Sequence, residues 1–62
     1  MNVTMTISYK DKTLPVRVVT YENYNRARVT AMDAFNFRFM ELDGHFINID
    51  EIAHIKIEKG EQ

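Results

Sequence analysis

Residues 42–58 carry the strictest hydrophobic pattern in the chain. Their isoleucines alternate with polar side chains in two runs, Ile47 with Ile49 and Ile55 with Ile57. Side chains two positions apart lie on the same face of a β-strand, so this alternation predicts two strands with one face against a core. Ile52 is out of phase with both pairs, which predicts a corner between the two strands at residues 50–52.

A tight hairpin is predicted just before these isoleucines. Asp43 and Gly44 both tolerate a positive φ, which a two-residue mirror-image turn requires. Upstream of the turn, Phe35, Phe37 and Phe39 alternate with polar side chains. We therefore expect this segment to form a strand whose three phenylalanines enter the core, where each would bury ~150–250 Å².

The beginning of the chain predicts two more strands. Residues 2–9 alternate apolar with polar side chains and are rich in β-branched types, which favour strands. After a polar turn, residues 13–21 form the second predicted strand. Its inward side chains are expected to be Leu14, Val16 and Val18. Proline cannot donate to a strand ladder, so the end of this strand that holds Pro15 is expected at a sheet edge or a bulge.

The middle of the chain fits two patterns. As a strand, residues 26–32 place alternate apolar side chains on one face. As a helix, residues 24–35 present an apolar stripe at helical spacing, which Asn23 can cap. Residue propensities favour the helix slightly, but no glycine or proline ends it before the phenylalanine segment. We favour the strand and expect an all-β fold, a small, antiparallel, partly open barrel of five to six strands. The alternative is an α+β fold with one helix around residues 24–34.

The length of the chain limits its core. We expect its 62 residues to form one domain, residues 1–62, with residues 59–62 as a frayed polar tail. A chain this short buries only ~60% of the surface that its unfolded form exposes. It contains no cysteine, so no disulfide or thiolate metal site supplements the core. We therefore expect self-association to supply stability.

The sequence contains little that could support catalysis. Ser8 is the only serine and has no neighbouring base, and no glycine-rich phosphate loop is present. His45 and His54 lie on strands separated by the predicted corner, without the spacing of a metal-ligand pair. We expect a non-enzymatic protein without cofactor, metal or small-molecule substrate. The chain has no signal peptide and no apolar run near ~18 residues, which predicts a cytoplasmic protein that does not bind a membrane.

Basic side chains gather in the first half of the chain. Residues 1–31 carry five basic and two acidic side chains, whereas residues 32–62 carry three and seven. Arginines and tyrosines are interleaved in and after one predicted loop. Arginines neutralise phosphates and tyrosines stack on bases, so this arrangement predicts a site for single-stranded nucleic acid. Its candidate residues are Tyr21, Tyr24, Arg26, Arg28 and Arg38.

Two segments resemble the motifs of the Sm-like family of small β-barrels, which includes the LSm proteins and the bacterial host factor. Residues 29–39 are similar to the first motif, in which apolar alternation leads to an aspartate, an apolar residue and an asparagine. Residues 46–55 are similar to the second motif, in which a strand turns sharply into a last short strand. The resemblance implies an SH3/Sm-like barrel, ring formation through edge strands, and a base contact by Asn36. The arginine and glycine of the second motif fall on Asn48 and Ile49, so that guanidinium is missing here.

These patterns lead to three expected functions, none of them enzymatic. The first is a nucleic-acid or nucleoprotein accessory factor that uses the residues named above. The alternative is a protein–protein interaction module, or a small inhibitor of mobile-element origin, that acts through an exposed β-edge. The third is a structural subunit of an oligomer.

Overall fold

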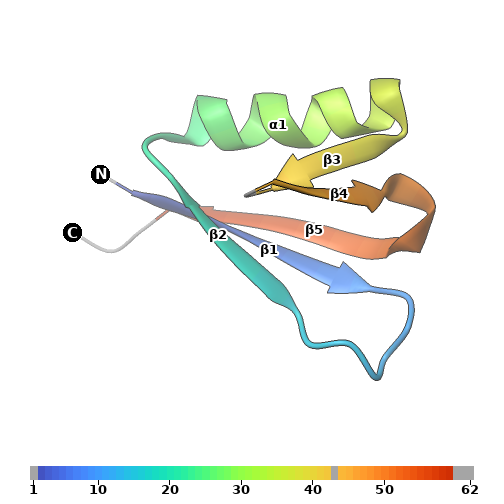
Figure 1. Cartoon of the computed structure of the whole chain (residues 1–62). Coiled ribbons are helices and arrows are strands. Elements are labelled where there is room, and N and C mark those ends of the chain that lie inside the picture. The colour runs from blue at the N-terminus through green and yellow to red at the C-terminus, as the bar shows by residue number, and fades with distance from the viewer. Residues whose placement is uncertain (1, 43, 60–62) are drawn as a thin grey trace.

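The computed structural model describes residues 2–42 and 44–59 (Figure 1). The elements in chain order are β1 (Val3–Tyr9), β2 (Arg17–Tyr21), α1 (Tyr24–Phe37), β3 (Phe39–Leu42), β4 (His45–Asn48), the 3-10 turn η1 (Ile49–Glu51) and β5 (Ile52–Lys59). All strand pairs are antiparallel. The expected antiparallel, mostly β character is confirmed, but the described chain also contains a helix.

β1 is the central strand of a three-stranded sheet with the order β2-β1-β5. Its predicted alternation is confirmed, because Val3, Met5 and Ile7 are buried on one face. β5 adds Ile55 and Ile57 to this face, where both are half-buried as expected. The sheet therefore has one apolar face that needs a cover.

α1 covers that face and replaces the strand that we favoured for residues 26–32, so the strand interpretation is wrong and the helical alternative is correct. Asn23 caps the helix as that alternative predicted, since its Oδ1 accepts a 2.9 Å hydrogen bond from the backbone N–H of Arg26. The helix ends at Arg38, which has a left-handed φ of 70°. Its N–H donates to the carbonyl of Ala34 at 2.8 Å. Glycine usually takes this position, so no residue type in the sequence marks the end of α1.

Small side chains form the face of α1 that packs on the sheet. Ala27 and Ala34 are buried and lie seven residues, or about two turns, apart. Because alanine extends so little from the helix axis, the backbone of α1 can approach the sheet closely. The large buried side chains come from other elements, among them Met5, Ile7 and Met40.

The strand predicted for the phenylalanine segment is wrong. Phe35 and Phe37 belong to the last turns of α1, and Phe39 begins β3 after the left-handed residue. All three side chains are exposed and take no part in the core.

β2 lies at the edge of the sheet and has the opposite phase to the predicted strand. Val19 and Tyr21 pack against the core, whereas Val18 is 59% exposed. The cause is the register with β1, which places Tyr21 opposite Val3 and so on the buried face. The residues expected to point inward are all at the surface: Leu14, Val16 and Val18.

The connection from β1 to β2 is longer than predicted, because β2 starts at Arg17 and not at residue 13. A turn inside it is closed by a 3.1 Å hydrogen bond from the N–H of Leu14 to the carbonyl of Asp11. Pro15 follows this turn and leads into an edge strand, as expected for a residue without an N–H.

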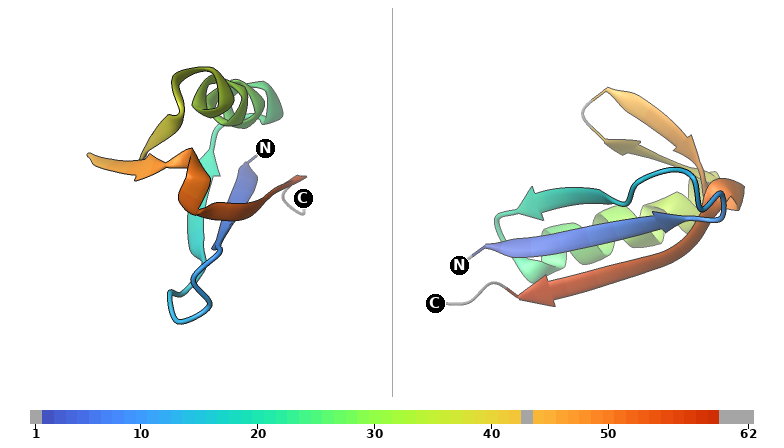
Figure 2. Two further views of the ribbon diagram at one scale, coloured as in Figure 1. Left: turned by 90° about the vertical axis from the view of Figure 1, so that its right-hand side faces the viewer. Right: turned by 90° about the horizontal axis from the view of Figure 1, so that it is seen from below.

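β3 and β4 form the predicted hairpin. Leu42 pairs with His45, so residues 43 and 44 make a two-residue connection in which Gly44 has a φ of 81°. Asp43, the other residue of the predicted turn, lies outside the described residues. Two further views show the hairpin projecting from the three-stranded sheet and the helix (Figure 2).

The predicted corner between β4 and β5 is confirmed as η1, one residue earlier than expected. The side chain of Asn48 caps it by accepting a 2.9 Å hydrogen bond from the N–H of Asp50. Ile49 and Ile52 are buried at its two ends. Lys59 ends β5, and the rest of the expected frayed tail lies outside the described residues.

The two sheets do not close into a barrel within the described chain, because β2 and β3 are not paired and α1 connects them. The Cα radius of gyration is 11.4 Å. A compact chain of this length would have about 10.6 Å. No helix among the described residues is long and apolar enough to cross a bilayer.

Candidate functional site

The residues predicted to bind nucleic acid do not share one face. Arg26 and Arg28 are both exposed on α1 but lie about 200° apart around its axis. Asn36 is ten residues beyond Arg26, which is about 15 Å along the helix. It lies on the last turn of α1 and not on a strand, unlike the position implied by the Sm-like resemblance.

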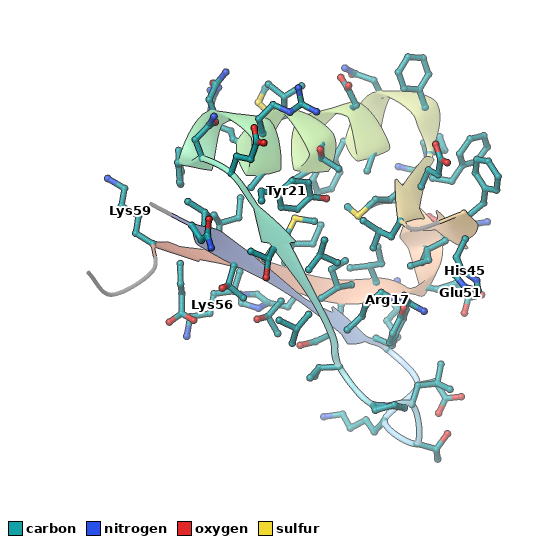
Figure 3. All side chains as sticks on the ribbon, turned by 60° about the vertical axis from the view of Figure 1, so that its left-hand side comes forward. Arg17, Tyr21, His45, Glu51, Lys56 and Lys59 are labelled. Atoms are coloured by element: carbon teal, nitrogen blue, oxygen red, sulfur yellow. The ribbon has the colours of Figure 1, made fainter. Side chains whose placement is uncertain are left out.

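Tyr21 has a structural position. It ends β2, is half-buried, and packs against the core. Figure 3 shows its ring between the sheet and α1. The part of the ring that packs against the core is not available to a base.

Arg38 has a partner within the chain. Its guanidinium forms an ion pair with Asp50 at 2.5 Å, which joins the end of α1 to η1. Its carbonyl accepts a 3.0 Å hydrogen bond from the N–H of Ile49. Both charged side chains are exposed, so the pair itself contributes at most about 1 kcal/mol. Arg38 thus lies between α1 and β3, and its charge is already paired with the carboxylate of Asp50.

One cation–aromatic group does assemble. Tyr24 and Arg28 lie one helical turn apart, and the ammonium of Lys59 is 5.9 Å from the centroid of the Tyr24 ring. The end of β5 brings Lys59 to the start of α1 (Figure 3). No sequence pattern selects Lys59, because the two residues are 35 positions apart in the chain.

All four phenylalanines of the chain are exposed, by 60% (Phe35), 66% (Phe37), 51% (Phe39) and 69% (Phe46). We call the two on the hairpin, Phe39 and Phe46, the phenylalanine surface. The rings of Phe39 and Phe46 meet edge to face, with centroids 6.0 Å apart and planes at 85°. The four residues occupy the last turns of α1 and the adjacent hairpin.

The positions of these residues explain their exposure. Phe35 and Phe37 are about 200° apart around α1, on the two flanks of the alanine face. In the hairpin, Met40 and Leu42 take the buried face, so Phe39 falls on the other face. The sequence prediction missed Phe46, although its phase opposite to Ile47 and Ile49 placed it on the face away from the core.

This surface concentrates exposed aromatic area in a small protein. Because a phenylalanine side chain can bury ~150–250 Å², Phe39 and Phe46 at 51% and 69% exposure present on the order of 200–300 Å² of aromatic surface. Phe35 and Phe37 add exposed aromatic area on the two flanks of α1. The largest apolar patch of a monomeric protein is often functional.

A shallow depression of about 280 Å³ lies beside Phe35 along β5. Its lining comprises Phe35, Ile49, Ile52, Ala53, His54 and Ile55. It lies where the end of α1 faces the start of β5. An apolar side chain of a partner could enter here beside the Phe35 ring.

A wider depression of about 510 Å³ lies at the β1–β2 connection, lined by Tyr9, Leu14, Pro15, Val16, Arg17 and Val18. Asp11 holds this connection in shape. Its carboxylate accepts hydrogen bonds from the hydroxyl and the N–H of Thr13, at 2.7 and 3.0 Å. These bonds favour the charged form and lower the pKa of Asp11 below its ordinary value of 3.8.

The described residues assemble no group of three or more histidine and carboxylate side chains that could hold a metal ion. His45 lies on the hairpin and His54 on β5, and both are exposed. Figure 3 shows His45 and Glu51 at the end of the molecule opposite Lys59.

Comparisons with known proteins find no match: no family model, no curated protein and no solved structure is significantly similar to this chain. The function is therefore inferred from the chain's own geometry, in which the phenylalanine surface is the most prominent feature.

Proposed function

We propose that this chain is a non-enzymatic protein-interaction module that binds an apolar surface of a protein partner through the phenylalanine surface. The observation that supports this proposal is the position of the four phenylalanines. The core is complete without them, and every one of them is more than half exposed.

The energetics favour a binding role for these side chains. Exposed aromatic area is unfavourable in water, and burying it in an interface stabilises the complex by about 25 cal/mol per Å². Aromatic residues are enriched at the centres of protein interfaces. Here the Phe39–Phe46 pair forms the apolar centre, and the polar side chains of Glu41 and Asn48, on the same face of the hairpin, supply a rim.

Affinity capture with matched variants tests the proposal. The bait is the wild type, the double variant Phe39→Ser/Phe46→Ser, or the control Leu14→Ser/Val18→Ser, which removes equally exposed apolar side chains elsewhere. Lysates are treated with nuclease before capture. We expect a specific protein that the wild type and the control retain and the phenylalanine variant loses.

The fold of each bait is checked by circular dichroism, because loss of capture is informative only if the phenylalanine variant still folds. Equal capture by all three baits would contradict the proposal. So would loss of the fold on Phe39→Ser/Phe46→Ser, since these side chains would then belong to the core.

The second candidate function is binding of single-stranded nucleic acid, in line with the Sm-like resemblance. Two observations support it: the group formed by Tyr24, Arg28 and Lys59, and the sharp η1 turn in the segment that resembles the second Sm motif. Fluorescence polarisation with labelled oligonucleotides tests it. Binding should weaken steeply from ~50 to ~200 mM salt and fall on Arg28→Ala but not on Arg26→Ala.

A further inference from the structure

The outer edge of β5 is an unused pairing site. β5 spans eight residues and is the longest strand described. It pairs with β1 on one side, and no other described strand pairs with its opposite side. A free edge about 26 Å long is a template for another strand, and proteins usually protect such edges.

The charges on β5 do not protect it against a second copy. A lone lysine on an edge strand protects it because two copies repel each other. Here Lys56 and Glu58 follow each other on the same face, with their charged atoms 3.2 Å apart. An antiparallel second copy presents these two charges in the reverse order, so each charge can face one of the opposite sign.

We propose that two copies of the chain associate by antiparallel pairing of their β5 strands, with the two-fold axis at Ile57. In this register Ile57 lies opposite Ile57 of the second copy. Lys56 lies opposite Glu58, and Glu58 opposite Lys56, so four charges of alternating sign form one cross-strand group. Opposite charges directly across an antiparallel pair are stabilising, and like charges are destabilising.

Neighbouring registers lack this complementarity. An axis at Lys56 places two lysines directly opposite each other. An axis at Ile55 places His54 opposite Lys56 and leaves Glu58 opposite Ile52. The charge pattern therefore favours the register with the axis at Ile57 over the neighbouring registers of the β5–β5 pair.

The pairing creates a continuous six-stranded sheet with the order β2-β1-β5-β5-β1-β2. The axis is perpendicular to the sheet, so both helices cover the same face. The half-buried Ile55 and Ile57 of each copy gain an apolar neighbour or the stem of Lys59 across the junction. This supplies the stability that a small core lacks.

The dimer leaves the phenylalanine surfaces free. The hairpin that carries this surface joins β5 through η1 at the Ile52 end, five residues or about 17 Å along the strand from the axis. The two copies thus present their phenylalanine surfaces at opposite ends of the assembly. The dimer proposal does not depend on the proposed function, and its test uses no partner.

Charge reversal tests the register by sedimentation velocity. We expect the wild type to sediment as a species with twice the 7.3 kDa mass of one chain. Lys56→Glu and Glu58→Lys should each weaken dimerisation at least about tenfold, because two symmetry-related pairs change from attraction to repulsion. An equimolar mixture of these two variants should form a heterodimer, in which every facing pair is again of opposite sign.

Two controls distinguish this interface from association through another surface. Lys12→Glu and Glu22→Lys make the same charge changes away from β5 and should leave the dimer intact. Phe39→Ser/Phe46→Ser should also remain dimeric. A wild type that stays monomeric at several hundred micromolar would overturn the proposal, as would dimers of Lys56→Glu and Glu58→Lys as tight as the wild type.

Disulfide formation measures the register directly, since the natural chain has no cysteine. On oxidation, Ile57→Cys should give a covalent dimer, because its Cα atoms face each other across the axis. Lys56→Cys should crosslink far more slowly. The reverse order of reactivity would overturn the register.

Discussion

At the scale of single residues, Arg38 decides how the chain leaves the helix. A non-glycine residue in the left-handed region is disfavoured by about 1–2 kcal/mol. Arg38 holds this conformation through its backbone bonds to Ala34 and Ile49 and its ion pair with Asp50. The same residue was predicted to bind nucleic acid, because a sequence shows an arginine's charge but not the carboxylate that it meets in the fold.

Substitutions at Arg38 separate the backbone strain from the ion pair. Arg38→Gly relieves the strain and loses the ion pair, whereas Arg38→Ala loses the ion pair and keeps the strain. We expect the glycine variant to be more stable than the alanine variant by about 1 kcal/mol in urea unfolding. Equal stabilities would show that the left-handed backbone at this position carries no strain.

At the scale of elements, α1 explains both the success and the failure of sequence prediction. Two strands were predicted correctly: β1, where apolar alternation covers the whole strand, and β5, from the alternation of Ile55 and Ile57. The hairpin with its glycine turn was also predicted correctly. The helix was only the alternative interpretation, because the phenylalanines at 35, 37 and 39 alternate across its end and imitate a strand. The face that α1 buries consists of alanines, which give only a weak hydrophobic signal.

The candidate site was less predictable than the fold. Which apolar side chains remain exposed depends on where α1 ends and how β3 is paired, and neither is encoded locally. Phe46 was an exception, because the alternation around it already placed it on the face away from the core. Lys59 reaches Tyr24 only through the tertiary fold.

The alanine face of α1 should tolerate little increase in volume. Ala34→Leu inserts a large side chain where helix and sheet are in contact and should destabilise the protein by about 1–3 kcal/mol in urea unfolding. Met32→Leu, on the exposed side of the same helix, should change stability by less than about 0.5 kcal/mol. A neutral Ala34→Leu variant would contradict the close approach of α1 to the sheet.

At the scale of the whole molecule, the chain combines a stable body with a projecting hairpin. The body is the three-stranded sheet with α1 on its apolar face. The hairpin has two strands, and isolated two-stranded hairpins are marginally stable in water. The phenylalanine surface lies on the outer face of this hairpin, whose inner face is held in the core by Met40 and Leu42.

Amide hydrogen exchange should resolve these two parts. We expect the amides of β3 and β4 to exchange faster than those of β1, which is paired on both sides. Amides on the outer edge of β5 should be protected in the wild type and lose protection in Lys56→Glu. Uniform protection across both sheets would contradict a separately opening hairpin.

The central position of β1 also has a consequence for synthesis. β1 is translated before the other strands described, and β2 soon provides one neighbour. Its other neighbour, β5, follows only after α1 and the hairpin have been translated. Until then the nascent chain carries an apolar strand with one unpaired edge. The pairing of Val3 with Lys59 also closes a loop that spans almost all the described residues, and such long-range contacts form slowly. Products truncated before Ile52 should therefore aggregate or be degraded, because they lack the strand that completes the sheet.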